Sequence, residues 1–140
     1  MHPQIAYNLC IEQVDLSRCL TTGLFKPSCT SRFDGQSAHE VVTRFAQNVR
    51  PVKAFNTLAW EVLINPQYEA GNASLFIAGD DAEAKEIVAQ LCRDMGLDPV
   101  DSGGTAAIPV METAFWPFYR LLVPHFGRDY SLRVLRRGEK

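Results

Sequence analysis

The sequence predicts an α/β protein in which a small parallel sheet is flanked by helices. Three observations support this prediction. Residues 74–78 form a continuous apolar run, which is typical of a strand buried on both faces of a parallel sheet. Segments with helical periodicity lie on both sides of this run. The resulting order, in which helices and short strands alternate along the chain, is that of an α/β fold.

The first clear helix follows Ser37. Ser37 and Glu40 have the spacing of a capping box, in which each side chain bonds the backbone of the other residue. Apolar residues then recur at helical spacing as far as Val49 and predict an amphipathic helix of about three turns. Pro51 closes it, and residues 52–55 are expected to form a short strand.

A brief second helix is predicted to carry Leu58, Val62 and Leu63 and to end before Asn65-Pro66. A loop through Gly71-Asn72 then leads to the apolar strand at residues 74–78.

The third helix has the strongest pattern in the chain. Asp80 is expected to be its N-cap and Glu83 to complete a capping box. Gly96 supplies the left-handed residue after its last turn, and residues 97–101 are predicted to form another strand. The apolar stripe of this helix comprises Ala84, Ile87, Val88, Leu91, Cys92 and Met95.

The last apolar stretch runs from Ile108 through Val123. Pro109 suits a first helical turn, whereas Pro117 should kink the helix or divide it in two. The stripe is too broad for a helix with one wet face, so the stretch is either centrally buried or packed on a second subunit. We expect a homodimer through Ile108–Val123. The basic residues from Arg128 to the end are expected to form a solvated terminal helix.

Composition bounds the function. The 140 residues suffice for one domain with a core, and the net charge of −2 argues against a nucleic-acid partner. No stretch approaches the roughly 20 apolar residues of a membrane span. The four cysteines form no CxxC pair, which argues against zinc. With no secretory signal pattern at the amino terminus, a reducing cytoplasm is the expected location. His39 is expected to face solvent.

Three motifs occur in one order with loop-sized gaps: VKAFNT at 52–57, FIAGDD at 76–81 followed by Ala84-Lys85, and Gly96-Leu97 leading to Asp101. Together with the tail at 127–137, they resemble the F420-dependent NADP oxidoreductase family, including its bacterial NADP reductase-like members. The resemblance covers about residue 32 to the end. It implies a Rossmann-like fold and a hydride transfer between NADP(H) and a deazaflavin (coenzyme F420) or a flavin.

The same resemblance implies cofactor-binding positions. Residues after the AFNT-type strand lie beside the nicotinamide and the second ring in this family, which indicates Asn56, Thr57 and Leu58 here. Members that use F420 tend to have His where this chain has Asn56. Pro109 stands where an Arg is expected, although Glu112 retains the family's acidic residue. The alternative is that Asn56 and Thr57 cap the following helix.

The family's glycine-rich turn, which seats the pyrophosphate, is not found. The nearest candidate, Ser102 to Thr105, lacks the spacing of GxGxxG. We therefore expect residues 1–31 to be an irregular, loosely attached leader and residues 32–103 to be the carboxyl-terminal half of a Rossmann-like domain. Residues 104–140 are the expected helical segment. The alternatives to an oxidoreductase that lacks its nucleotide half are a non-catalytic dimerising remnant and a fragment completed by a partner chain.

Overall fold

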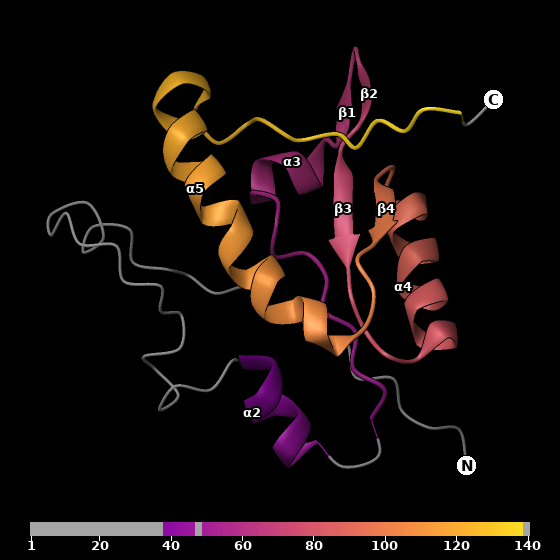
Figure 1. The fold of residues 1–140 in the computed structure, drawn as a ribbon. Coiled ribbons are helices and arrows are strands. Elements are labelled where there is room, and N and C mark those ends of the chain that lie inside the picture. The colour runs from indigo at the N-terminus through magenta and orange to yellow at the C-terminus, as the bar shows by residue number, and fades with distance from the viewer. Residues whose placement is uncertain (1–37, 47–48, 139–140) are drawn as a thin grey trace, which may run out of the picture.

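The computed structural model of the chain describes residues 38–46 and 49–138. Figure 1 shows a β3–β4 pair with α4 beside it and α5 lying across the other side. The elements, in chain order, are α2 (Ala38–Phe45), α3 (Trp60–Ile64), β1 (Gln67–Tyr68), β2 (Gly71–Asn72), β3 (Ser74–Ile77), α4 (Ala82–Asp94), β4 (Asp98–Asp101), a 3-10 turn (Thr105–Ala107) and α5 (Ile108–Phe126).

The predicted α/β class is confirmed, because β3 and β4 pair in parallel and α4 connects them. The register runs from Ser74 opposite Asp98 to Ile77 opposite Asp101. Parallel neighbours require a crossover of this kind, and a helix usually provides it. The small parallel sheet with its flanking helices is consistent with part of a Rossmann-like fold.

The two faces of β3 hold the protein together. Leu75 and Ile77 are nearly inaccessible and pack in the main core with Val88 and Cys92 of α4. Ala78 faces the opposite way and packs against Ile108 and Met111 of α5. The ring of Phe76 lies on that second face, with its centroid 4.9 Å from that of Phe115. Because successive side chains of a strand point to opposite faces, α4 covers one face of β3 and α5 covers the other. Cys92 is a buried core residue, as expected from the sequence.

The predicted strand at residues 52–55 is not formed. Lys53 makes a single antiparallel bridge to Ala78, in which each backbone N–H donates to the other residue's carbonyl, at 2.8 and 3.0 Å. Phe55 then adopts a left-handed φ of 63°, which turns the chain away from β3. Pairing consequently stops after one residue.

The capping of α4 differs from the prediction by one residue. Asp81, not Asp80, is the N-cap, and its carboxylate accepts a hydrogen bond from the Ala84 N–H at 2.8 Å. The predicted end of the helix is confirmed: Gly96 has φ 80°, and Leu97 N–H donates to Cys92 C=O at 2.9 Å. This is the closing bond of a Schellman motif.

The other helices also depart from expectation. α2 ends at Phe45 and so has about two turns, while its expected cap Ser37 lies outside the described residues. α5 is one helix through Pro117 and continues to Phe126. Pro117 deprives the Thr113 carbonyl of its usual donor, but this part of α5 is exposed, so water can replace the lost bond.

None of the described helices is both long and apolar enough to cross a membrane.

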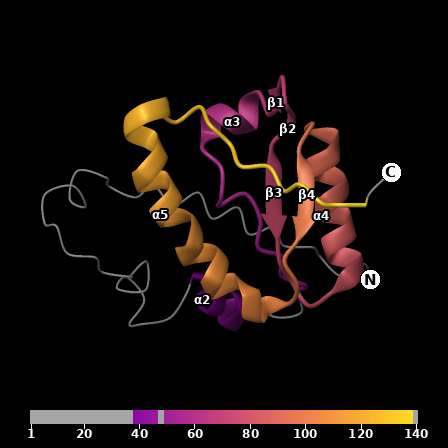
Figure 2. The same cartoon turned by 45° about the horizontal axis from the view of Figure 1, so that its top comes forward.

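The end of the chain forms a strap, residues 128–136, instead of the expected terminal helix. Ser74 N–H donates to Leu132 C=O at 3.2 Å, and Val134 N–H donates to the Ser74 hydroxyl at 3.1 Å. Figure 2 shows the strap crossing near β1 and β2, a small hairpin where a loop was expected. The strap thus covers an edge of β3 that would otherwise be unpaired. The leader and its three cysteines lie outside the described residues.

One buried ion pair connects the layers. Lys53 Nζ lies 2.9 Å from Glu112 Oε1 of α5, and the two side chains are 4% and 12% exposed. Because Lys53 also bridges to β3, a single residue joins the 52–55 segment, the sheet and α5.

We predict that Lys53→Met lowers the free energy of unfolding by about 3–5 kcal/mol in urea titrations, because Glu112 would remain buried without its cation. The double variant Lys53→Met, Glu112→Leu should recover most of this loss. Lys85→Met is the matched control, since the Lys85–Asp101 pair at 2.8 Å is more exposed (16% and 55%) and should contribute at most about 1 kcal/mol. Equal losses for Lys53→Met and Lys85→Met would contradict this account.

Candidate functional site

The strained backbone at Phe55 marks the start of the candidate site. Phe55 is the one non-glycine residue with positive φ in the part of the chain that the structure describes. A bulky residue in this conformation costs on the order of 1–3 kcal/mol and persists only where its surroundings enforce it. Here Lys53 is held by β3 and Glu112, and Ala54 is 4% exposed.

The turn at Phe55 leaves part of the outer edge of β3 open. Continued antiparallel pairing would place Phe55 opposite Phe76, two residues along from the Lys53–Ala78 bridge. The register with β4 uses the backbone groups of Leu75 and Ile77, so those of Phe76 point to the outer edge. No backbone partner meets them there among the described residues.

Asn56 and Thr57 follow the turn with polar atoms that are buried and unsatisfied. Asn56 Oδ1 and Thr57 Oγ1 have no hydrogen-bond partner within the described structure. Buried polar atoms are nearly always paired, and each exception costs roughly 1–3 kcal/mol. The capping alternative is wrong, because the N-cap of α3 is Ala59 and no side chain bonds there. Leu58, the third predicted residue, packs against the main core.

Glu61 adds a third acceptor that sequence reasoning missed. Its Oε1 lies 3.2 Å from Nε of Arg128 in the strap, while its Oε2 is buried without a partner. The sequence offered only a weak signal, an acidic residue between apolar neighbours in a short helix. Segment 56–61 therefore holds three buried oxygen atoms without a partner in the described structure, and such atoms are able to accept hydrogen bonds from N–H or O–H groups.

The glycine loop after β4 is already occupied by carboxylates. Thr105 donates from its N–H and its hydroxyl to Asp80, each at 2.8 Å, and Gly103 N–H donates to Asp101 at 2.8 Å. The Thr105 N–H bond, above all, lowers the pKa of Asp80. These acids would repel a phosphate, so the loop offers no pyrophosphate cradle. With Asp81 capping α4, both Asp80 and Asp81 have structural partners.

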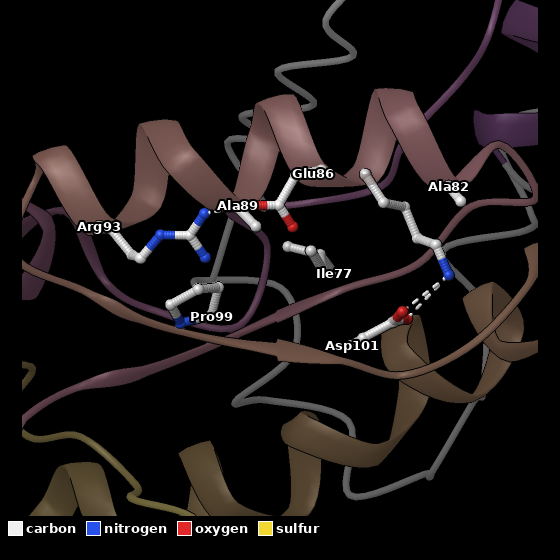
Figure 3. Close-up of a pocket in the computed structure, with 8 residues that line it drawn as sticks. Ile77, Ala82, Glu86, Ala89, Arg93, Pro99 and Asp101 are labelled. Carbon is white, nitrogen blue, oxygen red and sulfur yellow. Dashed lines mark hydrogen bonds and ion pairs between the residues drawn. The ribbon is translucent and has the colours of Figure 1, made fainter.

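A shallow cleft of about 360 Å³ between α4 and β4 has no unsatisfied charge (Figure 3). Lys85 pairs with Asp101, and Arg93 pairs with Glu86. Pro99 of β4 lines the same cleft. A proline and charged residues along an edge strand discourage further strand pairing. The cleft is therefore best explained as protection of the β4 edge.

The structure places three further residues that the sequence pattern singled out. His39 is only 8% exposed, so its predicted position in solvent is wrong; it lies near Lys53 and Asp80. Pro109 lies in the first turn of α5 and is exposed. Because proline carries no charge, this position lacks the cation that the family's Arg would provide. Glu112, the acidic residue that resembles the family's, binds Lys53 of the VKAFNT motif.

No protein-family model matches the chain. Among curated proteins, the rat (Rattus norvegicus) metalloreductase STEAP3 is 38% identical over 78 residues, which are 51% of this chain and 16% of that protein. A solved structure assigned as an F420-dependent NADP reductase of Arthrobacter sp. FB24 superposes with a TM-score of 0.63 at 27% identity, over 72% of this chain and 47% of that one. The solved structure of a hypothetical protein of Sinorhizobium meliloti superposes with a TM-score of 0.54 at 31% identity, over 74% of this chain and 46% of that one.

The fold and these relatives show an α/β protein that resembles NADP-dependent oxidoreductases. The particular resemblance predicted from the sequence, to the F420-dependent NADP oxidoreductase family, is confirmed. The chain spans about half the length of each solved relative and a smaller share of the curated one.

We predict that Gly104→Ala destabilises the loop after β4. An added Cβ would lie 2.5 Å from Asp80 Oδ1, whereas the φ of −80° at Gly104 is open to any residue. The carboxylate must move and lose its bonds to Thr105, a cost of about 1–3 kcal/mol in chemical denaturation. A double-mutant cycle checks the cause, because the same substitution should cost much less in the background of Asp80→Ala. Additive effects would argue against it.

Proposed function

We propose that this chain forms the part of an NADP-dependent oxidoreductase that faces the nicotinamide, and that it serves hydride transfer between NADP(H) and a deazaflavin or a flavin. The observation that carries the proposal is the pair of buried, unpartnered oxygens on Asn56 and Thr57. They lie at the positions that the family resemblance indicates for cofactor binding. An F420-dependent NADP reductase is among the solved structures that the fold resembles.

The donor chemistry of the cofactor suits these residues. The nicotinamide carboxamide carries two N–H donors, which Asn56 Oδ1 can accept, and the Thr57 hydroxyl can accept or donate. Leu58 would present an apolar surface to a ring. When bound, the two cofactors supply the hydride donor and acceptor. The chain's own residues would orient a ring and exclude water, which is how proteins assist such transfers.

The pyrophosphate needs a separate seat in this proposal. The 140 residues contain no glycine-rich turn of the GxGxxG type, and the loop at Ser102–Thr105 is lined by acids. We therefore propose that the nucleotide's phosphates are held by protein outside these 140 residues. Because Pro109 provides no cation, we propose either F420 or a flavin as the second ring.

Binding of NADPH and of reduced nicotinamide mononucleotide tests this function. We predict that both bind the chain at about millimolar Kd, roughly −4 kcal/mol, because only the nicotinamide end is recognised. Asn56→Ala and Thr57→Val should each weaken binding by about three- to tenfold, the effect of one hydrogen bond. Chemical-shift titration of the labelled chain measures the affinity and reports which residues respond.

Thr113→Val is the matched control, because the Thr113 hydroxyl bonds within exposed α5 and should not affect the site. If saturating ligand leaves the resonances of Asn56 and Thr57 unchanged, the proposal is wrong. Micromolar binding of NADPH alone would instead place the phosphate seat within this chain and overturn that part of the proposal.

We further propose that a second copy of the chain covers α5. Ile108 and Met111 are buried within the protomer, so they are not available to a partner. Elsewhere on α5, large apolar side chains remain exposed, and such patches commonly mark interfaces. These exposed apolar residues are Val110 (63%), Phe118 (47%), Leu121 (63%) and Phe126 (65%).

We predict that the chain is a dimer by light scattering and that Leu121→Glu shifts it to monomer, because a charge would be desolvated at the interface. Leu91→Glu, on exposed α4, is the control that should leave the assembly unchanged. A wild-type chain that is monomeric at about 100 μM, well above the micromolar Kd at which stable complexes form, would contradict a homodimer through Ile108–Val123.

A further inference from the structure

α2 has one side chain that is described as almost fully buried. His39 is the one residue of α2 whose side chain is described as buried, whereas Glu40, Arg44 and Phe45 are exposed. Figure 1 shows α2 standing apart, below the start of α5 and the end of β3. An eight-residue helix is too short to be stable alone, so the position of α2 depends on its packing, in which His39 is the most buried side chain and Val41, Val42 and Thr43 are half-buried.

Four charged groups lie near His39: Lys53 is buried, Glu112 is half-buried, and Asp80 and Glu40 are exposed. Lys53, from the segment that bridges to β3, is 3% exposed and pairs with Glu112 of α5. Asp80, from the loop after β3, bonds to Thr105. Glu40 of α2 itself is the remaining charged group near the imidazole. Glu112 is thus already paired with Lys53, and Asp80 already accepts hydrogen bonds from Thr105. Lys53 is the cation that acts on the pKa of His39.

We propose that α2 is a pH-sensitive latch, which docks through the neutral imidazole of His39 and is released when that imidazole takes up a proton. A protonated His39 would be a second buried cation beside Lys53, and removing a charge from water in this way is unfavourable. This device goes beyond the proposed function and does not depend on it.

The direction of the pH effect follows from linkage. Burial, followed by the charge of Lys53, lowers the pKa of docked His39 below its ordinary value of 6.5, although Glu112, Asp80 and Glu40 oppose this shift. An undocked His39 regains the ordinary pKa. Between the two pKa values the undocked form binds the proton and the docked form does not. Docking is therefore fully stable above about pH 6.5 and weakens below it, by at most about tenfold per pH unit for one proton.

Hydrogen exchange of the full chain tests the latch. Protection factors, corrected for the intrinsic exchange rate, should fall several-fold for residues 38–46 between pH 7.5 and pH 5.5. Those of α4 should stay constant, because no such histidine supports that helix. His39→Gln should abolish the pH dependence in α2, whereas His125→Gln, which changes an exposed histidine of α5, should retain it.

Because His39→Gln could also loosen α2 by lost packing, the wild-type imidazole provides a second measurement. Its NMR titration should have a midpoint below 6.5 that coincides with the change in the α2 amide resonances. A midpoint at or above 6.5 would overturn the proposal, and so would α2 protection that is equal at both pH values.

Discussion

The buried pair between Lys53 and Glu112 is the interaction on which the remaining structure depends. Burying both charges has a large desolvation cost, which only close geometry and mutual pairing can offset. In return the pair fixes one specific arrangement, because Lys53 also bridges to Ala78 through its backbone. The sheet, α5 and the segment that carries the candidate site thereby become one unit. His39 of α2 is buried near the same pair.

The candidate site follows from what this anchor permits. With Lys53 held, the chain can adopt the unfavourable turn at Phe55 and leave the edge of β3. Asn56 and Thr57 then lie in partly buried positions where neither the sheet nor α3 satisfies their oxygens. Strain and unsatisfied polar groups both reduce stability, and their occurrence at consecutive residues is typical of a binding site. The resemblance to an F420-dependent NADP reductase is the reason for proposing a nicotinamide cofactor as the ligand of these oxygens.

Local patterns predicted some elements well and others only in part. The stripe of α4 and the left-handed Gly96 were sufficient for the helix and its end, because both depend on near neighbours in the chain. Two adjacent aspartates are equally good caps by local rules, and the choice of Asp81 depends on Thr105, 25 residues from Asp80, which engages Asp80 instead. Similarly, nothing within residues 52–55 indicates that pairing stops after Lys53.

The sequence by itself determined the α/β class, the parallel order of β3 and β4, and the motifs that resemble the NADP oxidoreductases. These features follow from periodicity and from residue types close together in the chain. Only the tertiary structure decided that His39 is buried, that Glu112 binds Lys53, and that Asn56 and Thr57 cap nothing. Each of these depends on groups distant in sequence, whose desolvation and pairing set the energy, and no local propensity reports them.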